Sequence, residues 1–190
     1  MKIVKAVLAA SVTVMLAGCL SSSTRLPSYW NIESKGADVR LPDAKSGKVT
    51  RLSSLMVRSP YDSSRIVVLR ADGSLAFDPF NSFADGPRSL LAGPVFDLAR
   101  EFPQFGTVLP VSSVAKSDQT LAVDVIRLAL DGRKEGELWA VVEVRATLLR
   151  DRQVISSGFG DARIDAKGGD FSAAFSEAFS SAFRTACRAL

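Results

Sequence analysis

The chain has 190 residues and carries 24 Lys and Arg against 20 Asp and Glu, which gives a net charge of +4. The basic residues are dispersed and are not interleaved with aromatic residues, so we expect no nucleic acid as a partner. The chain has no histidine, which removes Ser-His-Asp and Cys-His catalysis and His-containing metal sites. We therefore expect no enzyme activity, no catalytic residues, no cofactor and no bound metal.

An apolar run near the N-terminus, residues 3–16, ends close to a cysteine. Basic residues lie at its start and small residues precede the cysteine: Lys2, Lys5, Leu16, Ala17, Gly18 and Cys19. This order resembles the lipobox of bacterial lipoprotein signal peptides. The resemblance implies that residues 1–18 are a signal peptide, that Leu16, Ala17 and Gly18 are recognised by the signal peptidase, and that Cys19 becomes the acylated (palmitate-bearing) lipid anchor.

A single transmembrane helix is the competing interpretation of the same run. Such a helix needs about 20 apolar residues, whereas Lys5 leaves only residues 6–20. One acyl chain holds a protein marginally and two or more anchor it stably. The sequence therefore favours a lipid anchor over a membrane span.

The remaining chain has the length of one domain with a hydrophobic core. We interpret residues 19–46 as the lipidated N-terminus and tether, because residues 20–24 form a short polar stretch, and residues 47–190 as a single α/β domain. Cys187 cannot form a disulfide with a thioether-blocked Cys19. We expect it to be a small buried hydrophobe on the last helix, with a free reactive thiol as the alternative.

The first half of the domain predicts short strands and one helix. An early strand is expected around residues 29–32. The β-branched run 65–70, the turn at Asp72-Gly73 and residues 74–77 predict a β-hairpin. Helical spacing from Pro87 to residue 102 predicts a helix, and Gly93-Pro94 inside it should kink or restart it.

The second half predicts a short strand over 108–114 and then three long strands over 120–130, 138–149 and 154–164. The last two are joined by a turn at residues 151–152, so the three form an antiparallel meander. The even-numbered residues of 138–148 are apolar and predict one buried face, whereas Glu143 and Arg145 mark the wetter face. A final helix is expected over 171–188, with Asp170 as its N-cap.

Four phenylalanines recur at every fourth position of this last helix: Phe171, Phe175, Phe179 and Phe183. Alanines accompany them and form one broad apolar stripe. The stripe is interpreted as core that packs on the meander, and the alternative is a hydrophobic contact surface for lipid or for a partner helix.

Two weaker motifs lie in the last strand and after it. Gly158-Phe159-Gly160 begins like a dinucleotide fingerprint, but it lies inside a strand, so it predicts close packing instead. The carboxylates Asp161, Asp165 and Asp170 bridge a strand end and a helix start, where solvation and capping explain them better than a metal site does.

Several short motifs follow the lipobox in a definite order: Arg58-Ser59-Pro60, the strand 65–70 that ends in Arg, the returning strand 74–77, Phe83-Ala84, and a helix that carries Leu90 and Leu91. This order resembles the ABC-type transport auxiliary lipoproteins, the family that includes the PqiC-like lipoproteins of intermembrane lipid transport. Phe83 stands where that family commonly has Trp, and Gly93-Pro94 is atypical of its helix.

The resemblance implies an α/β fold of the α+β type, with a mainly antiparallel sheet and two principal helices packed on one face. It also implies an auxiliary role beside an ABC transporter and an MCE-domain protein that moves lipid or other hydrophobic molecules, carried out by docking. Leu20 and Ser21 after Cys19 suggest the outer membrane, with the domain facing the periplasm. A homo-oligomer stays open.

Two other classes remain as alternatives. One is a structural or regulatory lipoprotein tethered to the outer membrane, such as a cell-wall synthase activator or a secretion-pore subunit. The other is an envelope enzyme, which would need a Ser-Lys pair such as Ser156 or Ser157 with Lys167, since histidine is missing.

Overall fold

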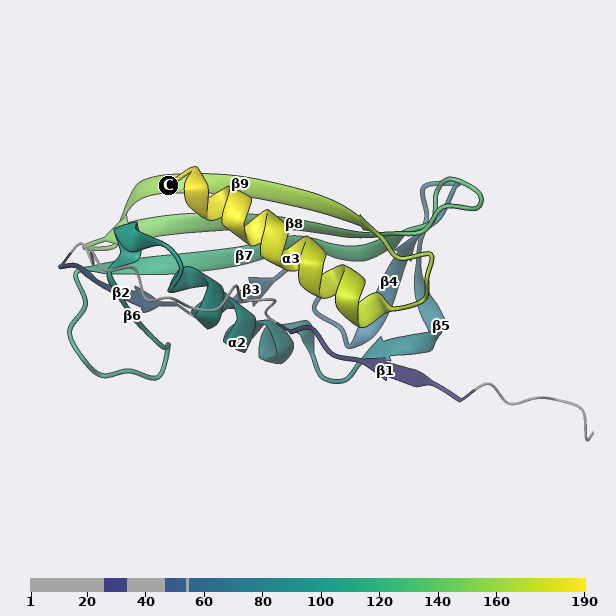
Figure 1. Cartoon of the computed structure of the whole chain (residues 1–190), viewed down its shortest axis with the longest axis horizontal. Helices are drawn as coiled ribbons and strands as arrows, with labels where there is room; N and C mark the ends of the chain where they lie inside the picture. The colour runs from purple at the N-terminus through teal and green to yellow at the C-terminus, as the bar shows by residue number, and fades with distance from the viewer. Residues whose placement is uncertain (1–25, 34–46, 54) are drawn as a thin grey trace, which may run out of the picture.

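A computed structural model describes residues 26–33, 47–53 and 55–190. Over these residues the fold is α+β, with a nine-stranded mixed sheet and two α-helices (Figure 1). The strands are β1 (Ser28–Trp30), β2 (Val49–Leu52), β3 (Met56–Val57), β4 (Arg65–Leu69), β5 (Leu75–Phe83), β6 (Thr107–Leu109), β7 (Gln119–Asp131), β8 (Trp139–Arg150) and β9 (Gln153–Asp165). The helices are α2 (Pro87–Ala99) and α3 (Phe171–Arg188), and a 3₁₀ turn, η1 (Pro103–Phe105), follows α2.

The long strand β7 connects the two halves of the sheet. One edge of β7 pairs antiparallel with β8, and β8 pairs antiparallel with β9, which confirms the predicted meander. Along its other edge β7 pairs in turn with β2, β3 and β4, all of them parallel. Three short segments of the first half therefore act as one interrupted strand beside β7, and the sheet is mixed.

The outer strands extend the sheet at its two ends. β4 and β5 form the predicted antiparallel hairpin, which continues to Phe83, and β1 pairs parallel with the end of β5. β6 pairs parallel with β2 but ends at Leu109, five residues before the predicted end. Pro110 has no backbone N–H to donate to a neighbouring strand, and its carbonyl accepts from Ser113 N in a turn.

Both helices lie on one face of the sheet (Figure 1). α2 begins at Pro87, as predicted, but it continues through Gly93-Pro94 without restarting. The Pro94 ring is buried beside Val95, so its packing offsets the hydrogen bond that proline removes. α3 has the predicted bounds, and the Asp170 carboxylate accepts from Ala173 N at 2.9 Å as the N-cap.

Helix α3 lies directly on strand β9. A Cβ atom added at Gly158 would lie 2.0 Å from the carbonyl oxygen of Ala186, and one added at Gly160 would lie 2.0 Å from that of Ala182. Real Cβ atoms do not approach backbone oxygen so closely. The two glycines are therefore required for this contact, and the close packing predicted for Gly158-Phe159-Gly160 is confirmed.

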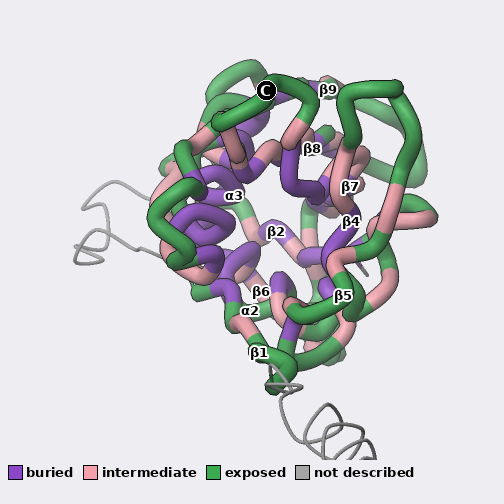
Figure 2. Tube along the Cα trace, turned by 90° about the vertical axis from the view of Figure 1, so that its right-hand side faces the viewer, coloured by how far each residue is buried: buried purple, intermediate pink, exposed green. Residues whose placement is uncertain are grey.

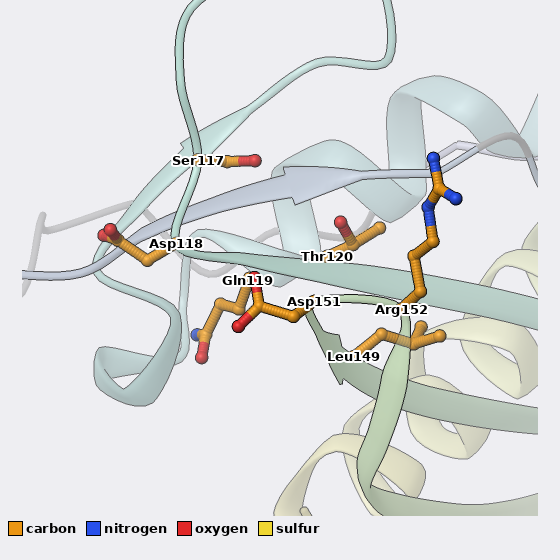
Figure 3. A pocket seen from close by; sticks show the side chains of 7 residues that line it. All are labelled: Ser117, Asp118, Gln119, Thr120, Leu149, Asp151 and Arg152. Carbon is orange, nitrogen blue, oxygen red and sulfur yellow. The ribbon is translucent and has the colours of Figure 1, made fainter.

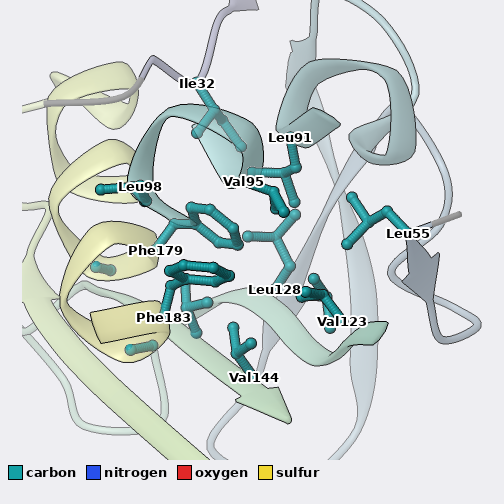
Figure 4. Packing of buried hydrophobic residues seen from close by; sticks show 14 of the residues in the cluster. Ile32, Leu55, Leu91, Val95, Leu98, Val123, Leu128, Val144, Phe179 and Phe183 are labelled. Carbon is teal, nitrogen blue, oxygen red and sulfur yellow. The ribbon is translucent and has the colours of Figure 1, made fainter. Parts of the chain in front are cut away.

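The phenylalanine stripe of α3 lies in the hydrophobic core. Phe175, Phe179 and Phe183 are completely buried and Phe171 nearly so. Phe175 packs edge-on against Phe83 at 5.2 Å between ring centroids, and Figure 4 shows Phe179 and Phe183 among side chains of α2, β7 and β8. Because the sheet covers this face of the helix, the stripe is not a contact surface for lipid or a partner.

Burial is concentrated between α3, β7 and β8, whereas the outer strands and turns are exposed (Figure 2). Within the described residues, no helix is both long enough and apolar enough to span a membrane. Cys187 is buried on α3, and this burial raises the pKa of its thiol to about 12. The thiol is therefore protonated and inaccessible near neutral pH, as expected of a small core residue.

Replacing Gly160 with Ala should destabilise the domain strongly, because the new methyl group meets backbone atoms that cannot rotate away. Overpacking of this kind costs about 1–3 kcal/mol or more. Urea unfolding followed by circular dichroism would measure the change. Gly168→Ala is the matched control, since nothing lies within 4 Å of its added Cβ. Equal stability of the two variants would contradict direct contact between α3 and β9.

Phe179→Ala should cost about 3–5 kcal/mol of unfolding free energy, as expected for a buried aromatic side chain. Phe159 on β9 is half exposed, and Phe159→Ala should change stability by no more than about 0.5 kcal/mol. Thermal or urea denaturation of both variants checks the assignment. A Phe179→Ala variant as stable as the parent would place the stripe outside the core.

Candidate docking site

The residues predicted to be cleaved and lipidated, Leu16, Ala17, Gly18 and Cys19, lie outside the described residues. The alternative Ser-Lys pair is not brought together. Ser156 and Ser157 lie near the start of β9, and Lys167 follows its end, about 30 Å farther along the extended strand. Among the described residues, no group of three or more Asp, Glu, Cys or His side chains is placed to hold a metal ion.

A hollow of about 250 Å³ opens at one end of the sheet, between the β8–β9 turn and the loop that precedes β7 (Figure 3). Its lining is polar apart from one leucine: Ser117, Asp118, Gln119, Thr120, Leu149, Asp151 and Arg152. A second hollow of about 340 Å³ shares three of these residues and adds Lys48, Lys116 and Arg150. Together they form a concave surface, which we call the distal site.

The β8–β9 turn is held in one conformation by its backbone. Asp151 and Arg152 both have positive φ angles, 49° and 65°, as in the two-residue turns that join twisted antiparallel strands. Arg150 pairs with Gln153 across this turn. The side chains of Arg150, Asp151 and Arg152 therefore project from a rigid hairpin end and not from a long loop.

The loop before β7 is tied to β2 at its end. Asp118 N donates to the Val49 carbonyl at 2.8 Å, and Val49 N donates to the Asp118 carboxylate at 2.8 Å. An Arg51 guanidinium nitrogen donates to the Ala115 carbonyl. These bonds fix residues 115–118 against the sheet, so the rim of the hollow is preorganised.

A buried amide lies next to the hollow. Gln119 is almost completely buried, and its Nε2 donates to Thr50 Oγ1 at 2.8 Å and to the Gln104 carbonyl at 3.3 Å. Its Oε1 has no hydrogen-bond partner within the described part of the chain. A buried acceptor without a partner costs about 1–3 kcal/mol of folding free energy. The start of β7 therefore carries a buried oxygen, Gln119 Oε1, that can still accept a hydrogen bond.

Charge and apolar surface coincide at this end. Four basic side chains and two carboxylates line the two hollows: Lys48, Lys116, Arg150 and Arg152, with Asp118 and Asp151. Val114 is fully exposed, and three further apolar side chains are about half exposed or more: Val111, Val154 and Ile155. A basic rim with protruding apolar side chains is suited to contact with a partner surface and not to chemistry on a small molecule.

A second charged cluster lies at the opposite end of β7. The Asp131 carboxylate is nearly buried and accepts from Arg133 Nε at 2.9 Å and Nη2 at 2.8 Å, with Arg163 at 3.9 Å. Arg163 stacks on the Trp139 ring at 4.6 Å. Because these charges satisfy one another, the cluster is structural. Hydrogen bonds from Arg133 above all lower the pKa of Asp131 to about 2.

The distal site was not predicted from the sequence. A turn was expected at residues 151–152 and a strand at residues 108–114, and no pattern in the sequence links these two segments. The site combines residues near positions 48, 116 and 151, which meet only after β2, β7 and β8 pair. The dipeptide Asp151-Arg152 was the one local signal, and it indicated a turn without indicating its neighbours.

The fold resembles those of two solved protein structures. Protein XCC0632 from Xanthomonas campestris, described as a member of family DUF330, matches with a TM-score of 0.58 and 23% identity, covering 82% of this chain and 86% of that protein. An uncharacterized protein matches with a TM-score of 0.51 and 15% identity, over 73% and 81% of the two chains. These matches show a shared fold.

Lipoprotein GNA1162 from Neisseria meningitidis matches at a TM-score of 0.40 and 13% identity, over 63% of this chain and 84% of that protein. At this TM-score the likeness carries no argument about the present chain. No protein-family model matches the sequence, and no curated protein does.

Asp131→Asn should remove about 2 kcal/mol of stability near neutral pH, because the native pKa of Asp131 is about 2, below its ordinary value of 3.8. The carboxylate contributes this stability above its unfolded-state pKa and loses it as the pH falls toward 2. The difference in unfolding free energy between the parent protein and Asp131→Asn should therefore disappear in acid.

Urea unfolding at several acidic and neutral pH values would measure this difference. Asp161→Asn, at an exposed position of β9, is the control and should change stability by less than about 0.5 kcal/mol at any pH. A gap between parent and Asp131→Asn that stays constant with pH would rule out the assigned ion cluster.

Proposed function

We propose that this protein is a lipid-anchored lipoprotein of the bacterial envelope that docks partner proteins as an auxiliary component of an ABC/MCE-type transport system for lipids or other hydrophobic molecules. The observation that carries the docking role is the distal site, with its rigid basic rim, its polar hollow and its protruding valines. The anchor rests on the sequence around Cys19.

The position of the distal site supports contact with a protein away from the anchor. The first described residue, Leu26, leads into β1, which lies toward the right-hand end of the long axis in Figure 1. The β8–β9 turn lies at the left-hand end, and β7, which runs between the two ends, has thirteen residues, a length of about 40 Å. The distal site, and any partner bound there, thus lies about 40 Å from the end of the domain that is nearer the proposed anchor.

The transport assignment rests on the resemblance described for the sequence, and the fold shared with XCC0632 is compatible with it. The expected partners are an MCE-domain protein and the ABC transporter subunits. Leu20 and Ser21 after Cys19 favour the outer membrane. A structural or regulatory lipoprotein of another class would also dock through this surface, so identification of the partner separates the two.

Cys19→Ala should abolish palmitate labelling and move the protein out of the membrane fraction, because no acyl chain then holds it. Metabolic labelling followed by fractionation checks this. Parent protein that takes up no label would overturn the anchor. Labelled parent protein found only in inner-membrane fractions would overturn the outer-membrane assignment alone.

In the acylated protein, the double substitution Val114→Glu and Arg152→Glu should lower recovery of the MCE-domain protein on co-purification by about tenfold. The variant loses the apolar contact of Val114 and reverses the rim charge of Arg152. Thermal stability should not change, since both side chains are exposed. Lys167→Glu, an exposed charge change in the loop before α3, is the matched control. Parent protein that never recovers an MCE-domain protein or ABC subunit would refute the transport role.

A further inference from the structure

Exposed apolar side chains also gather around β1 and β5. Leu26 is 80% exposed, Tyr29 is 68% exposed, and three others are roughly 40–50% exposed. The set, which we call the proximal patch, comprises Leu26, Tyr29, Leu75, Phe77 and Phe80. A monomeric protein rarely exposes several large apolar side chains together unless they contact something.

Strand register places three residues of the patch, Tyr29, Leu75 and Phe77, on the face of the sheet opposite α3. Tyr29 pairs with Ser82 in the parallel β1–β5 ladder, whereas Trp30 pairs with Phe83. The Phe83 ring contacts Phe175 of α3, so Tyr29 projects the opposite way. Phe77 pairs with Val67 on β4, and the Arg65 guanidinium lies over its ring at 4.2 Å.

The length of chain before β1 limits how far this patch lies from the lipid anchor. Six residues lie between Cys19 and Leu26, and an extended chain advances at most about 3.6 Å per residue, so the seven steps span about 25 Å in all. This step rests on the proposed lipid anchor at Cys19. The patch is then always within reach of the bilayer, whereas the distal site is at the other end of the long axis (Figure 1).

We infer that the proximal patch rests on the same bilayer that holds the acylated Cys19. Contact with lipid covers the exposed apolar surface, and the amphipathic Tyr29 side chain suits the interface between headgroups and acyl chains. The short tether makes this contact intramolecular, so weak apolar attraction is sufficient. The domain stands with its distal site pointing away from the membrane.

The charges around the patch indicate which lipids matter. Arg65 and Arg70 are exposed on or just after β4, and Asp72 and Asp78 lie on the β4–β5 turn and on β5. The two signs balance, so the contact depends on apolar surface and not on anionic headgroups. It should therefore persist at high salt, where attraction between a basic patch and anionic lipid is screened.

The test uses the full-length acylated protein in vesicles of phosphatidylethanolamine and phosphatidylglycerol, with an environment-sensitive fluorophore on a single introduced cysteine. Leu75→Cys places the label in the patch, and Val114→Cys places it at the distal site as the control. Cys19 is acylated, and Cys187 is buried with its pKa raised to about 12, so neither reacts with the label.

The label at Leu75→Cys should show a blue-shifted emission that nitroxide lipids quench, and high salt should not reverse it. The label at Val114→Cys should keep the emission seen in water. Adding Tyr29→Glu to the Leu75→Cys protein should remove the shift, since a charged side chain then enters the contact.

The alternative outcomes are distinguishable. Protein that does not float with the vesicles overturns the lipid anchor and this inference with it. Protein that floats while both labels report water overturns this inference alone. A blue shift at Leu75→Cys without quenching by nitroxide lipids, accompanied by self-association in light scattering, identifies a second copy of the chain as the occupant and also overturns it.

Discussion

The structure depends on the direct contact between helix α3 and strand β9. Gly158 and Gly160 leave no side chain between the strand and the carbonyl groups of Ala182 and Ala186. This approach sets the height of α3 above the sheet, and it leaves the phenylalanine stripe to fill the space toward β7, β8 and α2 (Figure 4). The small residues of β9 and the large residues that face β7 and β8 thus determine the position of α3 over the sheet.

A second constraint follows from the length of the meander. Among the described residues, α3 and α2 cover one face of the sheet, and no helix covers the opposite face or the ends of the long strands (Figure 1). Apolar and charged side chains are distributed unequally over these ends. One end carries the basic rim and the protruding Val114, and the other carries the proximal patch and the internally paired cluster around Asp131. The proposed membrane contact and the proposed partner contact therefore lie at opposite ends of the domain.

Much of the fold was predictable from local sequence. The meander, the β4–β5 hairpin and the bounds of α3 follow from residue periodicity, turn residues and capping by Asp170, which act within a few residues. Two predictions were wrong: α2 continues through Pro94 because that ring is buried by other parts of the chain, and β6 ends at Leu109 because Pro110 cannot donate a hydrogen bond. The distal site was not predicted, since its one local signal, Asp151-Arg152, indicates a turn but not the segments that pack beside it.

The sequence by itself determined the meander, the β4–β5 hairpin, the bounds and apolar stripe of α3, and the expectation of a lipid anchor at Cys19. The tertiary structure decided that this stripe is core, that β2, β3 and β4 align in parallel along β7, and that residues near positions 48, 116 and 151 form one concave surface. The physical reason is that sequence periodicity shows which face of a helix or strand is apolar but does not show which other segment packs against that face. Coverage depends on pairing between distant segments, and here it depends on how closely two glycines allow a helix to approach a strand.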